Sequence, residues 1–161
     1  MAGASSSSVL MHASCISIAG RGALLVGPSG VGKSDLTLRL MHGAAQIAAQ
    51  SDGRTSPVDL VADDQVIIER RGDQLVARAP ANLAGLVEVR GLGILRMPFA
   101  AEAGLYLVVD LAKSCAIERL PDPMPSLEIL GHRLPLMCLD AFEASAPLKV
   151  ALALTRRPIV S

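Results

Sequence analysis

Aromatic residues are scarce in this chain of 161 amino acids, which holds two Phe, one Tyr and no Trp. Single-stranded nucleic acids stack their bases on aromatic side chains, so this scarcity argues against such a surface. A net charge is also absent, because 15 Lys and Arg balance 15 Asp and Glu. The chain therefore has no overall basic field to attract nucleic acid. We expect no nucleic-acid partner, an aliphatic core, and anion binding confined to a local site.

Cysteines and long apolar runs are few as well. Cys15, Cys115 and Cys138 are far apart and show no metal-binding spacing, and their odd number does not suggest a disulfide framework. We interpret them as buried free thiols in a reducing cytosol. No apolar run approaches the roughly eighteen residues of a membrane-spanning helix, and residues 1–8 do not resemble a signal peptide. The expected location is cytoplasmic, without membrane contact.

Aliphatic residues, in contrast, are abundant: 51% of the chain is hydrophobic, which is enough to fill one core. We predict a flexible N-terminal tail over residues 1–8 and a single domain over residues 9–161. Residues 44–57 are interpreted as a helical extension followed by a surface loop. Alternating or apolar patterns predict strands over 9–18, 23–26, 58–62, 65–69, 74–78, 87–95, 104–111, 127–130 and 134–139.

A glycine-rich motif stands between a short apolar run and a helical pattern. Residues 27–34 read Gly-Pro-Ser-Gly-Val-Gly-Lys-Ser and fit the phosphate-binding pattern G-x-x-x-x-G-K-[ST]. Glycines let backbone N–H groups converge on an anion, and the following helix adds partial positive charge at its N-terminus. Lys33 can reach the β- and γ-phosphates, and the Ser34 hydroxyl can bind Mg²⁺. The predicted nucleotide-binding residues are Gly27, Pro28, Ser29, Gly30, Val31, Gly32, Lys33 and Ser34.

This motif sets the predicted fold class. Only two helical patterns occur, one after Ser34 and one from Ser145 to about Arg156, whereas strand patterns fill much of the remainder. Strand and helix alternate weakly after Asp64, so a doubly wound sheet is not expected. We predict an α/β fold: a P-loop kinase core with a mixed, strand-rich sheet and few helices.

Two acids, Asp63 and Asp64, close the predicted strand 58–62. Phosphoryl-transfer enzymes place carboxylates near the phosphate loop to handle Mg²⁺ and the nucleophile. Successive strand residues point to opposite faces, so only one acid can face the phosphates unless the strand bends. The alternative interpretation is an Asp-Asp turn into the next strand.

Glu88 and Arg90 share one face of the predicted strand 87–95, and Gly91 and Gly93 permit close approach or a bend. The pair either presents a carboxylate and a guanidinium to a metal-bound nucleotide or forms a solvated surface. His12, in the first predicted strand, would lie near the phosphate loop if strands 9–18 and 23–26 form a hairpin.

The order of these motifs resembles the catalytic domain of HPr kinase/phosphorylase, the bifunctional regulator of bacterial sugar phosphotransferase systems. The motifs are His12, the loop 27–34, residues 61–64 (Val-Ala-Asp-Asp), residues 79–80 (Ala-Pro) and residues 88–94 (Glu-Val-Arg-Gly-Leu-Gly-Ile). The last string is the most specific. The resemblance covers residues 12–120 well and the remainder weakly.

The resemblance implies a role for each matching residue. Lys33 and the loop backbone would hold ATP, while Ser34, Glu88 and Asp63 would bind or help to bind Mg²⁺. Asp64 resembles the acid that takes the serine proton in the kinase direction and returns it in the phosphorylase direction. His12 and Arg119 resemble the active-site histidine and arginine of the family.

The resemblance also implies a phosphocarrier substrate, HPr or a relative of it, and a homo-oligomer, a hexamer in the family. The chain looks like a short, single-domain form without the N-terminal domain of longer members. Residues 44–57 are additional to the family pattern. The stretch near residues 131–133, where the family has a segment linked to dephosphorylation, is altered, which weakens the prediction of phosphorylase activity. Two alternatives stay open: a P-loop kinase of small molecules, and a non-catalytic sensor module that binds ATP.

Overall fold

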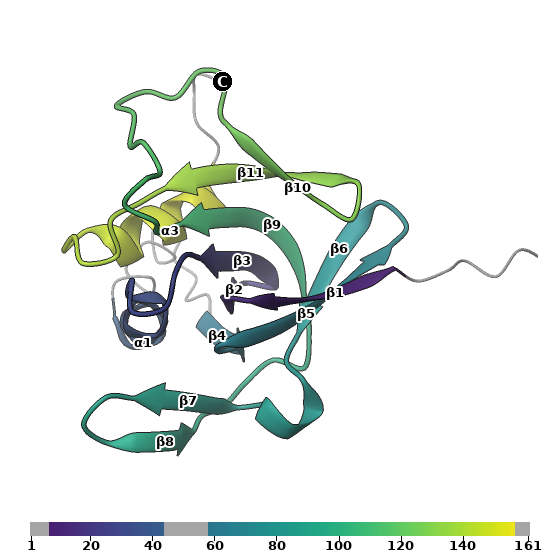
Figure 1. Ribbon diagram of the computed structural model, residues 1–161, viewed down its shortest axis with the longest axis vertical. Coiled ribbons are helices and arrows are strands. Elements are labelled where there is room, and N and C mark those ends of the chain that lie inside the picture. The colour runs from purple at the N-terminus through teal and green to yellow at the C-terminus, as the bar shows by residue number, and fades with distance from the viewer. Residues whose placement is uncertain (1–6, 44–57, 157–161) are drawn as a thin grey trace, which may run out of the picture.

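The computed structural model describes residues 7–43 and 58–156 (Figure 1). Its helices are α1 (Lys33–His42) and α3 (Ala146–Thr155), and one 3₁₀ turn, η2, covers Ala81–Leu83. Its strands are β1 (Ser8–His12), β2 (Ser14–Ile18), β3 (Arg21–Val26), β4 (Val58–Ala62), β5 (Gln65–Arg71), β6 (Gln74–Arg78), β7 (Leu86–Val89), β8 (Gly93–Arg96), β9 (Ala103–Asp110), β10 (Ser126–Ile129) and β11 (His132–Cys138).

Nine strands form one mixed sheet in the order β1-β5-β6-β9-β3-β2-β4, with β11 on β9 and β10 on β11. β3 and β11 are parallel to β9, whereas β2 is antiparallel to both β3 and β4. It follows that β3, β4, β9 and β11 all run in the same direction and end at the same edge of the sheet. The predicted mixed, strand-rich α/β fold with few helices is confirmed.

Both faces of the sheet are buried, because alternate residues of its central strands enter two different clusters. Ile16, Ala23 and Leu25 pack with α1 and α3 on one face. Cys15 and Leu24 pack on the other face with residues of β5, β6 and β10. None of the buried apolar residues in the described part of the chain is aromatic, as the composition predicted.

The strand expected over residues 9–18 is two strands. β1 pairs with β5, whereas β2 pairs with β3 and β4, and the chain switches partners at Ala13. The Ala13 N–H donates to the carbonyl oxygen of Asp64 at this point (3.2 Å). An apolar pattern does not reveal which neighbour a strand will choose, so the break was not visible in the sequence.

The strand expected over residues 87–95 is a hairpin of β7 and β8, separate from the large sheet (Figure 1). The Leu92 N–H donates to the Val89 carbonyl (3.0 Å), and Gly91 and Gly93 adopt positive φ. The bend that the two glycines permit is therefore a complete reversal of the chain.

The prediction of three free thiols is wrong for two of the cysteines. Cys115 and Cys138 form a disulfide, with Cα atoms 5.6 Å apart, and Cys15 alone is free and buried. The pair was missed because Cys115 lies in an irregular stretch and Cys138 at the end of a strand, 23 residues later. Sequence spacing does not report such a proximity.

Two expectations for the less regular parts of the chain remain as predictions. The extension and loop over residues 44–57 lie outside the described residues, as do residues 1–6 of the expected tail, while Ser8 already belongs to β1.

In the part that is described, neither helix has the length and apolar character needed to cross a membrane.

Candidate functional site

The predicted phosphate loop, residues 27–34, joins the end of β3 to the start of α1. Gly27, Gly30 and Gly32 all adopt positive φ, which L side chains rarely tolerate. A Cβ on Gly27 would lie 2.9 Å from Val31 Cγ1, and one on Gly32 would lie 2.9 Å from Ala141 Cβ. No side chain caps α1, so the N–H groups of its first turn are left for an external acceptor such as an anion.

The Lys33 side chain is almost buried, with 7% of the residue exposed. Its ammonium group turns back onto the loop and donates to the carbonyl oxygens of Gly27 (2.7 Å) and Pro28 (2.9 Å). Burial lowers the pKa of Lys33, while the negative charges of Asp64 and Asp63 oppose that shift. A cation held in a loop of this kind is suited to an anionic ligand, because the negative charge of the ligand would stabilise the ammonium charge that burial disfavours.

Asp63 is the buried member of the acidic pair, with 6% of its surface exposed. One oxygen, Oδ1, accepts hydrogen bonds from the hydroxyl groups of Ser14 (2.8 Å) and Ser34 (2.9 Å). Ser34 stands in the first turn of α1, so this contact joins the phosphate loop directly to the end of β4. Asp63 and Ser34 thus offer adjacent oxygen ligands of the kind that Mg²⁺ prefers.

Asp64 is the exposed member of the pair and leaves the strand in the left-handed conformation (φ 70°). Its Oδ1 lies 3.2 Å from Nδ1 of His12, and the two side chains are 65% and 50% exposed. The left-handed turn lets Asp64 line the same cavity as Asp63. The strand bends where the pleat would have placed the acids on opposite faces.

These groups line one cavity of about 530 Å³. The loop, the two acids and the β7–β8 hairpin form its walls, and Glu88 and Arg90 of the hairpin segment both face it. Val87, next to Glu88, is fully buried and anchors the hairpin. The predicted site residues that line the cavity are His12, Ser29, Gly30, Gly32, Lys33, Ser34, Asp63, Asp64 and Glu88.

Arg119 is placed differently. It lies in the irregular stretch between β9 and β10, it is exposed, and it does not line the cavity. Its assignment rests on a short sequence match, and its role as a catalytic residue stays a prediction.

Ser14 and Phe142 line the cavity but were missed in the sequence. Ser14 is a buried strand residue without a motif, so nothing in the sequence distinguishes it from a core serine. Phe142 did carry a signal, because it is one of only three aromatic residues in the chain.

A metal ion at this site would need ligands from phosphate and water in addition to those of the protein. Among the described residues, no three His, Cys, Asp or Glu side chains gather closely enough to hold a metal ion. Mg²⁺ is commonly bound by one or two carboxylates together with phosphate oxygens and water, so Asp63, Ser34 and Glu88 fit that mode rather than a closed protein cage.

Comparison with known proteins places the chain in a family. HPr kinase/phosphorylase of Chlorobium limicola is 36% identical over 146 residues, which is 81% of this chain and 39% of the relative. The Cupriavidus metallidurans protein of the same name is 38% identical over 136 residues, 76% of this chain and 37% of the relative. The chain thus spans about two fifths of the length of these relatives.

The solved structure of the HPr(Ser) kinase/phosphatase from Coxiella burnetii has the same fold, with a TM-score of 0.68 over 90% of this chain and 93% of that chain, at 24% identity. Residues 4–144 match the model of the HPr serine kinase C-terminal domain. This chain therefore belongs to the family of HPr serine kinase C-terminal domains.

Proposed function

We propose that this protein is an ATP-dependent protein serine kinase that phosphorylates HPr or a related phosphocarrier of the phosphotransferase system. The observation that carries the proposal is the meeting of the phosphate loop, the Ser34–Asp63 hydrogen bond and the Asp64–His12 pair in one cavity. The names of the relatives support the choice of substrate. The reverse reaction, phosphorolysis of the phosphoserine, is part of the same proposal.

ATP fits the phosphate loop for reasons of charge and space. The uncapped start of α1 and the Lys33 ammonium supply donors and positive charge for the β- and γ-phosphates. The glycines leave the backbone uncovered at the positions where side chains would collide with the loop or its neighbours.

The expected metal is Mg²⁺, held by Ser34, Asp63 and Glu88 together with phosphate oxygens. When bound, Mg²⁺ neutralises charge that develops on the phosphoryl oxygens. The chain contributes three oxygen-bearing side chains from α1, the end of β4 and the β7–β8 hairpin. Glu88 is exposed, whereas Asp63 is held by hydrogen bonds from its two serine partners.

Asp64 is the proposed general base. The serine hydroxyl oxygen of the phosphocarrier attacks the γ-phosphorus, the bond to the β–γ bridging oxygen breaks, and ADP leaves. Asp64 accepts the serine proton, and its exposed position makes it accessible to a protein substrate. In phosphorolysis, Asp64 takes a proton from inorganic phosphate as the phosphate oxygen attacks the phosphoserine phosphorus. The bond from that phosphorus to the serine oxygen breaks, Asp64 passes the proton to the serine oxygen, and pyrophosphate leaves.

His12 and Arg119 act on this chemistry in different ways. His12 lies against Asp64 and orients its carboxylate. Arg119 is assigned to charge stabilisation by resemblance, which requires the stretch between β9 and β10 to approach the phosphates. The family resemblance also implies a homo-oligomer, a hexamer, as the working form, and we propose a cytoplasmic location.

Transfer of label from [γ-³²P]ATP to purified HPr, with the Lys33→Ala variant as control, tests the proposal. We expect labelled phosphoserine on HPr with the wild-type protein and none with Lys33→Ala. A wild-type protein that binds ATP tightly and labels no phosphocarrier would instead be the ATP-binding sensor module. Label appearing on a small hydroxyl compound would point to the small-molecule kinase.

A further inference from the structure

We propose that the Phe142 ring binds the purine base of the nucleoside triphosphate whose phosphates the loop holds. This inference rests on the proposed ATP-binding function of the same cavity. It assigns a residue to the base, for which the sequence motifs provide no partner.

The acids and Phe142 lie on opposite sides of the phosphate loop. β3, which leads into the loop, lies between β2 and β9 in the sheet. On one side β2 pairs with β4, and Asp63 and Asp64 directly follow β4. On the other side β9 pairs with β11, and Phe142 follows β11. A triphosphate whose reacting end points to the acids therefore directs its nucleoside end toward Phe142.

The Phe142 ring rests on the phosphate loop itself. A Cβ built on Gly32 would lie 3.0 Å from Phe142 Cζ, so the ring edge touches the backbone one residue before Lys33. The residue is nevertheless 67% exposed and lines the cavity. Of the side chains that line this cavity in the described part of the chain, it is the single Phe, Tyr or Trp. A large exposed aromatic face at the nucleoside end of a phosphate site is suited to stacking of a base.

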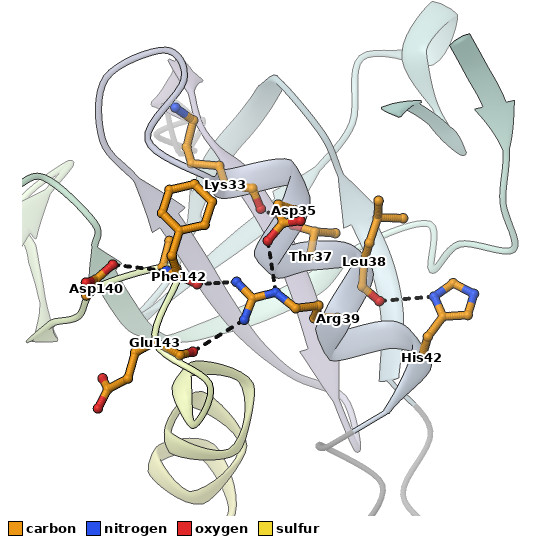
Figure 2. A network of polar contacts seen from close by, with 10 residues as sticks. Lys33, Asp35, Thr37, Leu38, Arg39, His42, Asp140, Phe142 and Glu143 are labelled. Atoms are coloured by element: carbon orange, nitrogen blue, oxygen red, sulfur yellow. Dashed lines mark hydrogen bonds and ion pairs between the residues drawn. The ribbon is translucent and has the colours of Figure 1, made fainter. Parts of the chain in front are cut away.

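Polar contacts hold the segment that carries the ring before any ligand arrives (Figure 2). Asp140 Oδ1 accepts a hydrogen bond from the Phe142 N–H (3.0 Å). The Arg39 guanidinium of α1 donates to the carbonyl oxygens of Ala141 and Glu143. Arg39 is in turn oriented by an ion pair with Asp35 (2.9 Å). The helix that begins at the phosphate loop thus also positions the backbone that carries the ring, which reduces the ordering cost of binding.

Stacking on an aromatic ring is worth about ten-fold or more in affinity per base and does not depend strongly on base identity. Replacing Phe142 by Leu keeps an apolar side chain over Gly32 and removes the aromatic face. We expect Phe142→Leu to bind Mg-ATP about ten-fold more weakly and to bind inorganic tripolyphosphate as the wild-type protein does. Phe99→Leu makes the same chemical change outside the cavity and is the matched control.

Phe142→Trp gives a direct readout, because the chain contains no tryptophan of its own. We expect this variant to retain ATP affinity and its fluorescence to change strongly with Mg-ATP and weakly with Mg-tripolyphosphate. Calorimetric titration of both ligands against the wild-type protein and the three variants completes the experiment.

Unchanged ATP affinity in Phe142→Leu would overturn the inference. So would an equal loss for ATP and tripolyphosphate, which would mean that Phe142 supports the loop and does not contact the base. A wild-type protein that binds ATP with the expected pattern but transfers no phosphoryl group would refute the proposed kinase activity and support the base contact.

Discussion

Asp63 and Asp64 are adjacent in the chain and line the same cavity, yet their environments have little in common. Asp63 is buried and accepts two serine hydroxyl hydrogen bonds, whereas Asp64 is exposed and pairs with His12. The left-handed backbone at Asp64 makes this possible, because it turns the second carboxylate away from the direction that the strand pleat would impose. The two acids can therefore do different chemical work from neighbouring positions.

Asp64→Asn should lower the rate of phosphoryl transfer and leave ATP affinity close to that of the wild-type protein. Asparagine tolerates the left-handed conformation, so the fold should persist while the proton acceptor is lost. General base catalysis contributes roughly a hundred- to ten-thousand-fold, which sets the size of the expected loss. Rates measured in the forward and reverse directions should fall together, since one group moves the proton both ways. A fast variant would remove Asp64 as the base.

Asp63→Asn should act on affinity and stability more than on the proton transfer step. The substitution replaces a charged acceptor of two hydroxyl groups by a neutral one, at a cost of about 1–3 kcal/mol in unfolding free energy. It also removes one carboxylate from the expected Mg²⁺ ligands. Urea unfolding and calorimetric titration of Mg-ATP measure the two effects, with Asp64→Asn as the matched control. Identical defects in the two variants would contradict separate roles for the acids.

The sequence allowed the prediction of the strand-rich α/β fold, the phosphate loop and the pair of acids, because each leaves a local pattern. It did not show Ser14 as a partner of Asp63, since the two residues are 49 positions apart in the chain. The β7–β8 reversal and the partner switch at Ala13 were hidden for a similar reason: periodicity reports burial and not pairing. Left-handed backbone at a non-glycine residue such as Asp64 is likewise set by tertiary contacts.

Glu88→Gln should raise the Mg²⁺ concentration required for half-maximal transfer and leave the fold intact. The residue is exposed, so the neutral isostere costs little stability, but the cavity loses one negative charge that faces the expected metal. Glu128→Gln, at an exposed residue of β10 outside the cavity, is the control. If the Mg²⁺ titration of the variant matches the wild-type curve, Glu88 does not bind the metal and belongs to a solvated strand face.

A count of reactive thiols distinguishes the Cys115–Cys138 disulfide from the three free thiols that the cysteine spacing predicted. In non-reducing urea we expect one reactive thiol, Cys15, and after reduction we expect three. Cys115→Ser should leave Cys138 free and raise the non-reduced count to two. Three thiols in the non-reduced, unfolded wild-type protein would contradict the disulfide.

In the folded protein Cys15 should stay unreactive well into the alkaline range. Burial raises the pKa of this thiol to about 12, from an ordinary value of 9.0, because the charged thiolate is excluded from the core. The nucleophilic form is therefore absent at pH 8–9 in the native state, and alkylation must wait for unfolding. The contribution of Cys15 to the free energy of unfolding is therefore fully present below pH 9 and is lost as pH rises toward 12, because the unfolded chain releases the thiol proton first. Alkylation rates at pH 8 that rise with urea and vanish without it would agree with this prediction; rapid alkylation of Cys15 in the native protein would refute it.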